Sequence, residues 1–115
     1  MIEEYEVESF LQDFKVKLNT FDIRFRDDRG KNTNTLLALE IPPNYRVEII
    51  KTLSSQDYSE GPIPEIMNNN SPMWVFGKEV KGEEIYIKIT MGKIGRNVIC
   101  ISFHIAEHPM IYPFK

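Results

Sequence analysis

The spacing of apolar residues in the first half of the chain predicts helices. In residues 4–16 the apolar positions follow helical spacing and form one stripe, made of Val7, Phe10, Leu11 and Phe14. A second, short helix is predicted over residues 33–41, and it must stop there because two prolines follow. The second of these, Pro43, can open a third helix that runs to Leu53. Three helices are therefore expected in this half of the chain.

Elsewhere, apolar and polar residues alternate, which is typical of strands. Residues 21–26 alternate in this way. The pattern is clearest in three segments joined by a tight turn and a glycine-containing loop: Met73–Val80, Glu84–Met91 and Val98–Ile105. Residues 60–72 are rich in Gly, Pro and Asn and predict an irregular loop, and two prolines in residues 106–115 predict an extended tail. Helices come first and hairpins last. We therefore expect one α+β domain over residues 1–115, with N-terminal helices packed on a mainly antiparallel C-terminal sheet.

Side chains alternate between the two faces of a strand, and this decides which residues share a surface. On the second of the three strands, one face carries Ile85, Ile87 and Ile89, and the other carries Tyr86, Lys88 and Thr90. On the third strand, one face carries Ile99, Ile101, Phe103 and Ile105, and the other carries Val98, Cys100, Ser102 and His104. We expect the helices to cover the isoleucine faces. The opposite face then gathers Tyr86, Lys88, Ser102 and His104.

The orientation of the first strand depends on the length of its turn with the second. With a three-residue turn, Lys78 lies beside Tyr86. Phe76 and Trp74 then share that face, whereas a two-residue turn inverts every side chain. Gly82 can supply the left-handed residue of a bulged, three-residue turn, which favours the first arrangement.

Composition narrows the class of protein. Of 115 residues, 42% are hydrophobic and 27% are charged, which is typical of a globular protein and too apolar for a disordered one. The apolar runs are too short for a membrane span, and the acidic start lacks the basic and apolar order of a secretory signal. The single cysteine, Cys100, cannot form an internal disulfide, so we expect a cytoplasmic protein in which this thiol is buried and inert.

The net charge of −3 is distributed unevenly along the chain. Residues 1–77 hold 8 basic and 13 acidic residues, whereas residues 78–115 hold 6 basic and 4 acidic residues. Attraction to phosphate is therefore expected from the last third of the chain.

The polar face of the predicted sheet can supply the groups that metal-independent RNA cleavage needs. These are a base for the 2′-hydroxyl, an acid for the leaving 5′-oxygen and positive charge on the phosphate. The candidate catalytic residues are Tyr86, His104, Lys78 and Lys88. The candidate RNA-binding residues are Lys93 and Arg96 for phosphate, and Trp74 for base stacking. Structural interpretations stand beside these roles, because surface histidines and lysines and core tryptophans are common. Two histidines and one cysteine argue against a zinc site.

Two segments of the predicted sheet resemble a known family. Glu84-Ile85-Tyr86-Ile87-Lys88-Ile89-Thr90, followed by Val98-Ile99-Cys100-Ile101-Ser102-Phe103-His104, is similar to the closing hairpin of the MqsR toxins. These are the motility quorum-sensing regulator toxins of type II toxin–antitoxin pairs. Upstream, Leu53-Ser54-Ser55-Gln56-Asp57-Tyr58 and Met73-Trp74 fall at similar distances, so the resemblance covers residues 45–104.

The resemblance implies a RelE-like α+β fold and an mRNA endoribonuclease that uses neither metal nor cofactor. The family's tyrosine falls on Tyr86, and its lysine after the Ser-Phe of the last strand falls on His104, which can also transfer protons. Two positions depart from the family: Glu60 stands where it has a lysine, and Val75 where it has a glutamine. Lys78 is predicted to fill this gap.

The leading hypothesis is a toxin that cuts single-stranded mRNA and leaves 2′,3′-cyclic phosphate and 5′-hydroxyl ends. His104 would act as general acid or base, Tyr86 would orient or transfer a proton, and Lys78 and Lys88 would stabilise the phosphorane. Its expected partners are mRNA and a cognate antitoxin that binds DNA, with no membrane, and the free toxin is expected to be monomeric. Two alternatives stay open. One is a non-catalytic module that binds a protein through a sheet edge and the Pro-rich tail, and the other is an RNA binder that does not cleave.

Overall fold

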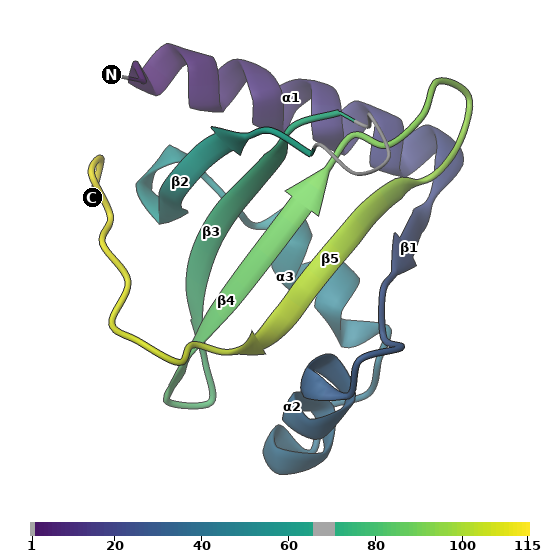
Figure 1. Ribbon diagram of the computed structural model, residues 1–115, viewed down its shortest axis with the longest axis vertical. Helices are drawn as coiled ribbons and strands as arrows, with labels where there is room; N and C mark the ends of the chain where they lie inside the picture. The colour runs from purple at the N-terminus through teal and green to yellow at the C-terminus, as the bar shows by residue number, and fades with distance from the viewer. Residues whose placement is uncertain (1, 66–70) are drawn as a thin grey trace.

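The computed structural model describes residues 2–65 and 71–115, and within them helices precede most of a single sheet (Figure 1). The elements in chain order are α1 (Glu4–Phe21), β1 (Ile23–Phe25), α2 (Lys31–Leu39), α3 (Tyr45–Lys51), the 3-10 turn η1 (Ser55–Asp57), β2 (Tyr58–Ile63), β3 (Met73–Val80), β4 (Glu83–Thr90) and β5 (Val98–Ile105). The three predicted helices and all the predicted strands are present in this order, so the α+β prediction is confirmed.

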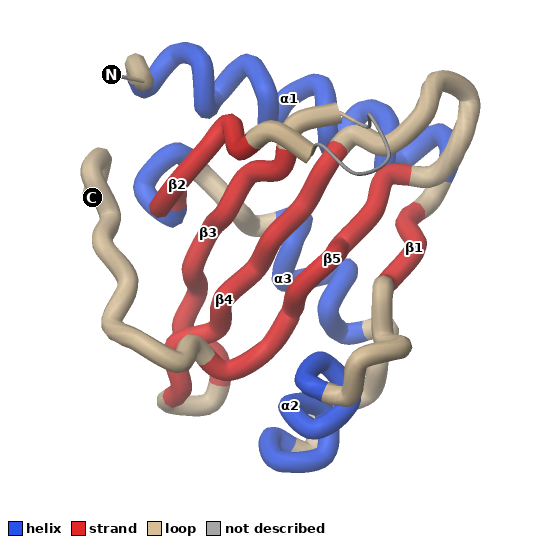
Figure 2. Tube along the Cα trace, viewed as in Figure 1, coloured by secondary structure: helices blue, strands red, loops and turns tan. Residues whose placement is uncertain are grey.

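The five strands form one mixed sheet in the order β1-β5-β4-β3-β2 (Figure 2). The pairs from β2 to β5 are antiparallel, and β1 runs parallel to β5 at one edge. In Figure 1, α1 and α3 lie behind the sheet, and the viewer looks onto its other face. We call this uncovered side, which carries Tyr86 and Lys88, the open face.

The core lies between α1, α3 and the covered face of the sheet. The buried stripe of α1 consists of Val7, Leu11, Phe14 and Leu18. It packs in one cluster with Ile85, Ile87 and Ile89, which have no exposed surface. The helix runs to Phe21, beyond the predicted end at residue 16, because Leu18 continues the apolar stripe.

The hairpin of β3 and β4 has a two-residue turn, so the predicted three-residue turn is wrong. Val80 pairs with Glu83, and the two turn residues, Lys81 and Gly82, have φ of 52° and 82°. Positive φ at both positions is the signature of a turn whose twist matches the flanking strands. The register therefore places Lys78 opposite Ile85, on the covered side of the sheet.

A β-bulge in β5 changes the predicted faces of that strand. Lys88 pairs with Ser102 and Ile89 pairs with Cys100, which leaves Ile101 as an extra residue. Before the bulge, the buried residues are Val98 and Cys100, and the open face carries Ile99 and Ile101, the reverse of the prediction. After the bulge the faces agree with the prediction, with Phe103 buried and Ser102 and His104 on the open face.

Strand β2 occupies part of the segment that was predicted to be an irregular loop. It is an edge strand with register shifts on both sides of Glu60. The remainder of the predicted loop includes residues 66–70, which lie outside the described residues. The predicted tail is confirmed, since residues 106–115 contain neither helix nor strand.

Candidate active site

The open face of the sheet holds a groove of about 1050 Å³. Its floor includes the four polar residues that strand alternation gathers there: Tyr86, Lys88, Ser102 and His104. One wall comes from the segment between β1 and α2, a second from Ser59 and Glu60 of β2, and a third from tail residues 107–111. Segments that are distant in the sequence therefore surround the predicted residues.

Tyr86 and His104 face each other across β4 and β5. They are direct partners in the register, and their rings stack with centroids 5.2 Å apart and an interplanar angle of 13°. The Nζ of Lys88 lies 5.9 Å from the centroid of the Tyr86 ring, and Lys88 itself pairs with Ser102. A phenol, an imidazole and an ammonium group thus share one small area, as the predicted face requires.

A backbone contact fixes the tautomer of the His104 ring. Its Nδ1 lies 3.0 Å from the carbonyl oxygen of Ile105. Because a carbonyl oxygen only accepts hydrogen bonds, Nδ1 must carry the proton for this bond to form. In the neutral ring, Nε2 is then an unprotonated base, and in the charged ring it is a proton donor. Either state suits proton transfer in the groove.

The phenol of Tyr86 remains protonated well into the basic range. Burial raises its pKa above the ordinary value, and the negative charge of Glu60 raises it further. Tyr86 therefore acts as a hydrogen-bond donor at neutral pH rather than as a phenolate.

The basic residues of the groove come mainly from the N-terminal half of the chain. Besides Lys88, the groove is lined by Arg26, Arg29 and Lys31, all between β1 and the start of α2. Arg26 lies 3.7 Å from Asp28, and Lys31 lies 2.9 Å from Glu107 of the tail, both as exposed ion pairs. Three of the four Lys and Arg residues that line the groove thus lie outside the last third of the chain, from which attraction to phosphate was expected. The clustering of three basic residues around Gly30 was the available signal.

Four of the predicted site residues lie elsewhere. Lys78 forms an ion pair of 3.0 Å with Asp57, on the covered side of the sheet. The prediction that it shares the face of Tyr86 is therefore wrong. Trp74 also lies on the covered side, where its ring stacks on Phe10 at 4.5 Å, so the predicted stacking on a base is not available. The other two, Lys93 and Arg96, are exposed on the loop between β4 and β5 and do not line the groove.

The bulge that orients His104 is held by a side chain of α2. The Oδ1 of Asn32 accepts a hydrogen bond from the Phe103 amide at 2.8 Å, and its Nδ2 lies 3.3 Å from the Ile101 carbonyl oxygen. Further along β5, the Oγ1 of Thr35 accepts from the Ile105 amide at 3.0 Å. These side chains continue the edge pairing of β5 beyond the end of β1, so the backbone groups released by the bulge remain bonded.

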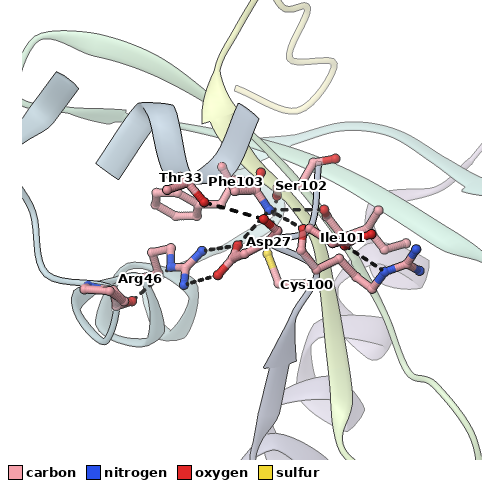
Figure 3. A network of polar contacts seen from close by, with 11 residues as sticks. Asp27, Thr33, Arg46, Cys100, Ile101, Ser102 and Phe103 are labelled. Atoms are coloured by element: carbon pink, nitrogen blue, oxygen red, sulfur yellow. Dashed lines mark hydrogen bonds and ion pairs between the residues drawn. The ribbon is translucent and has the colours of Figure 1, made fainter. Parts of the chain in front are cut away.

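An ion pair between a buried guanidinium and a partly exposed carboxylate supports this part of the groove (Figure 3). Two nitrogens of Arg46, which is 2% exposed, donate to the two carboxylate oxygens of Asp27 at 2.8 and 2.9 Å. The guanidinium also lies 3.8 Å from the centroid of the Phe25 ring. The hydrogen bond from Arg46 lowers the pKa of Asp27, against the opposing effect of burial. The neighbouring Cys100 has no exposed surface, and burial raises the pKa of its thiol to about 12, which confirms the predicted buried cysteine.

The tail crosses the open face at one end of the groove. The hydroxyl of Tyr112 donates to Glu84 Oε2 at 2.6 Å, and the amide of Met110 donates to Glu84 Oε1 at 3.2 Å. The Tyr112 ring rests directly on Gly77, where a Cβ atom would collide with it. A residue without a side chain at position 77 is therefore what lets the tail dock.

No protein-family model, curated protein sequence or solved structure matches the chain. In the described ranges, no helix combines the length and apolar character that crossing a membrane requires. Within those same ranges, no group of three His, Cys, Asp or Glu side chains is placed to hold a metal ion.

Proposed function

We propose that this chain is the toxin of a type II toxin–antitoxin pair and cleaves single-stranded mRNA. The observation that carries the proposal is the stacked pair of Tyr86 and His104 beside Lys88 in the groove. Acid–base cleavage of RNA needs a proton-transfer group, a hydrogen-bond donor and a cation at one phosphate, and these three side chains meet that need. The resemblance of the same two strands to the MqsR toxins, with their RelE-like fold, points to the same chemistry.

In this proposal, the scissile phosphate lies over the floor of the groove. The ammonium group of Lys88 stabilises the negative charge that develops on the phosphorane. Tyr86 donates a hydrogen bond to a phosphate oxygen, since its raised pKa keeps the phenol protonated. His104 transfers a proton through Nε2, because Nδ1 is committed to the carbonyl oxygen of Ile105. The products are a 2′,3′-cyclic phosphate and a 5′-hydroxyl.

The basic wall supports the choice of a nucleic-acid substrate. Arg26, Arg29 and Lys31 lie along one side of the groove, where phosphates neighbouring the cleavage site would bind. A short single-stranded segment fits this arrangement, because its bases and sugar hydroxyls can reach the floor between the walls. The predicted antitoxin would restrain the activity by covering the groove or by blocking the approach of RNA.

Three forms of the full chain test the proposal: the natural one, Tyr86→Phe and His104→Ala. We expect both substitutions to reduce RNA cleavage by roughly 10² to 10⁴, with the larger loss for His104→Ala. Growth arrest on expression is expected to weaken in parallel. Because both residues are only half-buried, thermal melts of the three forms should be similar. Equal RNA cleavage and equal toxicity for all three forms would remove the site assignment.

One observation favours a second candidate, a non-catalytic protein-binding module. Two of the three cations of the basic wall are already paired, Arg26 with Asp28 and Lys31 with Glu107, which leaves less positive charge for RNA. Purified protein that leaves RNA intact and co-purifies with a protein encoded beside it would favour this candidate.

A further inference from the structure

Two β-bulges lie on opposite sides of the groove, and each changes which side chains of its strand reach the open face. The bulge at Ile101 of β5 brings Ser102 and His104 to this face. The second bulge is in β2, where Tyr58 pairs with Phe76 but Glu60 pairs with Val75. Bulges are enriched beside active sites, where they redirect a side chain.

The effect of the β2 bulge on Glu60 follows from the register. Continued without interruption from the pairing of Tyr58 with Phe76, the strand would place Glu60 opposite Trp74, on the covered side. The extra residue shifts Glu60 to a position opposite Val75, and its side chain lines the groove. Glu60 and His104 therefore both owe their position in the groove to an inserted residue.

The register also gives the relative positions of these two residues. Glu60, Val75, Lys88 and Ser102 form one row across β2, β3, β4 and β5, and His104 lies two residues beyond Ser102. Glu60 and His104 are thus three strand spacings apart and offset by two residues along the strand, about 16 Å between backbones, with Lys88 and Tyr86 between them. In an in-line displacement at phosphorus, the attacking and leaving oxygens are on opposite sides of the phosphorus atom. A base on one wall and an acid across the floor, with a cation between them, suit that geometry.

The electrostatics of the floor agree with this placement. The charge of Glu60 contributes to the raised pKa of Tyr86, and both residues line the groove. Glu60 is also exposed, so a substrate in the groove can reach its carboxylate. A carboxylate in this position can accept a proton from a bound hydroxyl group.

We propose that Glu60 is a catalytic residue, the general base that activates the 2′-hydroxyl, with His104 as the general acid; this inference rests on the proposed ribonuclease function. The carboxylate of Glu60 takes the 2′-hydroxyl proton as the 2′-oxygen forms a bond to phosphorus. The bond from phosphorus to the 5′-oxygen breaks, and the 5′-oxygen takes the Nε2 proton of the charged His104 ring. Glu60 ends protonated and His104 neutral, and exchange with water restores both.

The test measures cleavage of a short single-stranded RNA by the full chain as a function of pH. Glu60→Gln keeps the size of the side chain and removes the base. Glu79→Gln is the matched control, because Glu79 is an exposed carboxylate on β3 that does not line the groove. We expect Glu60→Gln to lower kcat/KM by roughly 10² to 10⁴ and to abolish the acidic limb of the pH–rate profile. Glu79→Gln should leave both unchanged.

A second measurement separates catalysis from simple repulsion of phosphate. It is the affinity for the same RNA with a 2′-deoxyribose at the cleavage site. This analogue cannot be cleaved, because it lacks the attacking 2′-hydroxyl. If Glu60 only repels phosphate, Glu60→Gln will bind this analogue more tightly and cleave RNA at least as fast as the natural chain, which overturns the inference. Slow cleavage with undiminished binding supports it. If the natural chain itself cleaves no RNA, the proposed function fails, and the assignment of Glu60 fails with it.

Discussion

The side-chain oxygen of Asn32 accepts a hydrogen bond from the backbone amide of Phe103 at 2.8 Å, and this bond links α2 to the bulged strand that carries His104. Asn32 is 4% exposed, and its amide nitrogen contacts the carbonyl oxygens of Arg26 and Ile101. One side chain therefore satisfies backbone groups of two segments that border the groove. The orientation of His104 depends on this side chain, although Asn32 lies on another element.

We expect Asn32→Ala to lower the free energy of unfolding by about 1–3 kcal/mol, because it leaves buried backbone groups without a partner. Cleavage of RNA should fall as well, because the bulge that places His104 loses its support. Asn34→Ala is the matched control, since Asn34 is an exposed residue of the same helix. Urea denaturation and cleavage rates check both effects. A fully stable, fully active Asn32→Ala form would show that the bulge keeps its conformation without the Asn32 side chain.

The ion pair of Asp27 and Arg46 gives a prediction for acid stability. The pKa of Asp27 is below its ordinary value of 3.8 in the folded protein, so its ionised form is favoured by folding. This contribution is complete above the ordinary pKa and is lost as the pH falls through the lowered, folded-state pKa. We expect Asp27→Asn to cost about 3 kcal/mol or less at neutral pH, since Arg46 stays buried while Asp27 is partly exposed.

Urea denaturation at neutral and at acidic pH measures this contribution. The difference in stability between the natural chain and Asp27→Asn should shrink at acidic pH, where the natural carboxylate is protonated as well. Asp28→Asn is the control, because the side chain of Asp28 is 65% exposed. A difference that stays constant across this pH range would count against the ion pair as the source.

The docked tail gives a third prediction. The hydrogen bond from Tyr112 to Glu84 ends on a charged acceptor, and Tyr112→Phe should weaken tail docking by about 1–2 kcal/mol. Gly77→Ala should have a larger effect, because the new methyl group would occupy the position of the Tyr112 ring. Limited proteolysis within residues 106–115 reports release of the tail. A double-mutant cycle with Glu84→Gln isolates the bond, and additive effects would show that the two side chains do not interact.

The pattern of apolar and polar residues was sufficient to predict the regular helices and strands of the fold. Alternation in β4 placed Tyr86 and Lys88 together, because β4 pairs with β3 without interruption and such a strand keeps a period of two. The apolar stripe of α1 was equally clear. In the hairpin, Lys81-Gly82 is compatible with turns of two or three residues, and the choice between them decided the position of Lys78. A one-residue uncertainty in a turn therefore moved a candidate catalytic residue to the wrong face.

The two bulges could not be predicted from local sequence. The bulge in β5 is stabilised by Asn32, about 70 residues earlier in the chain. Nothing within the strand marks Ile101 as the extra residue, so the predicted faces were inverted over its first half. In β2, the Gly61-Pro62 pair reads as a loop, so the strand register that directs Glu60 into the groove was not predicted. These are long-range effects, and they decide the composition of the candidate site.

The distribution of positive charge around the groove gives the last prediction, which concerns RNA binding rather than cleavage. Arg29 lines the groove, whereas Lys93 lies on an exposed loop away from it. If phosphates follow the basic wall, Arg29→Ala should weaken binding of a non-cleavable RNA analogue and reduce the slope of log affinity against log salt concentration by about 1. Lys93→Ala removes the same charge and should change neither quantity. Equal losses for the two substitutions would mean that RNA is attracted by the overall field of the protein. The groove would then not be a specific RNA-binding path, because such a path requires Arg29→Ala to weaken binding more than Lys93→Ala does.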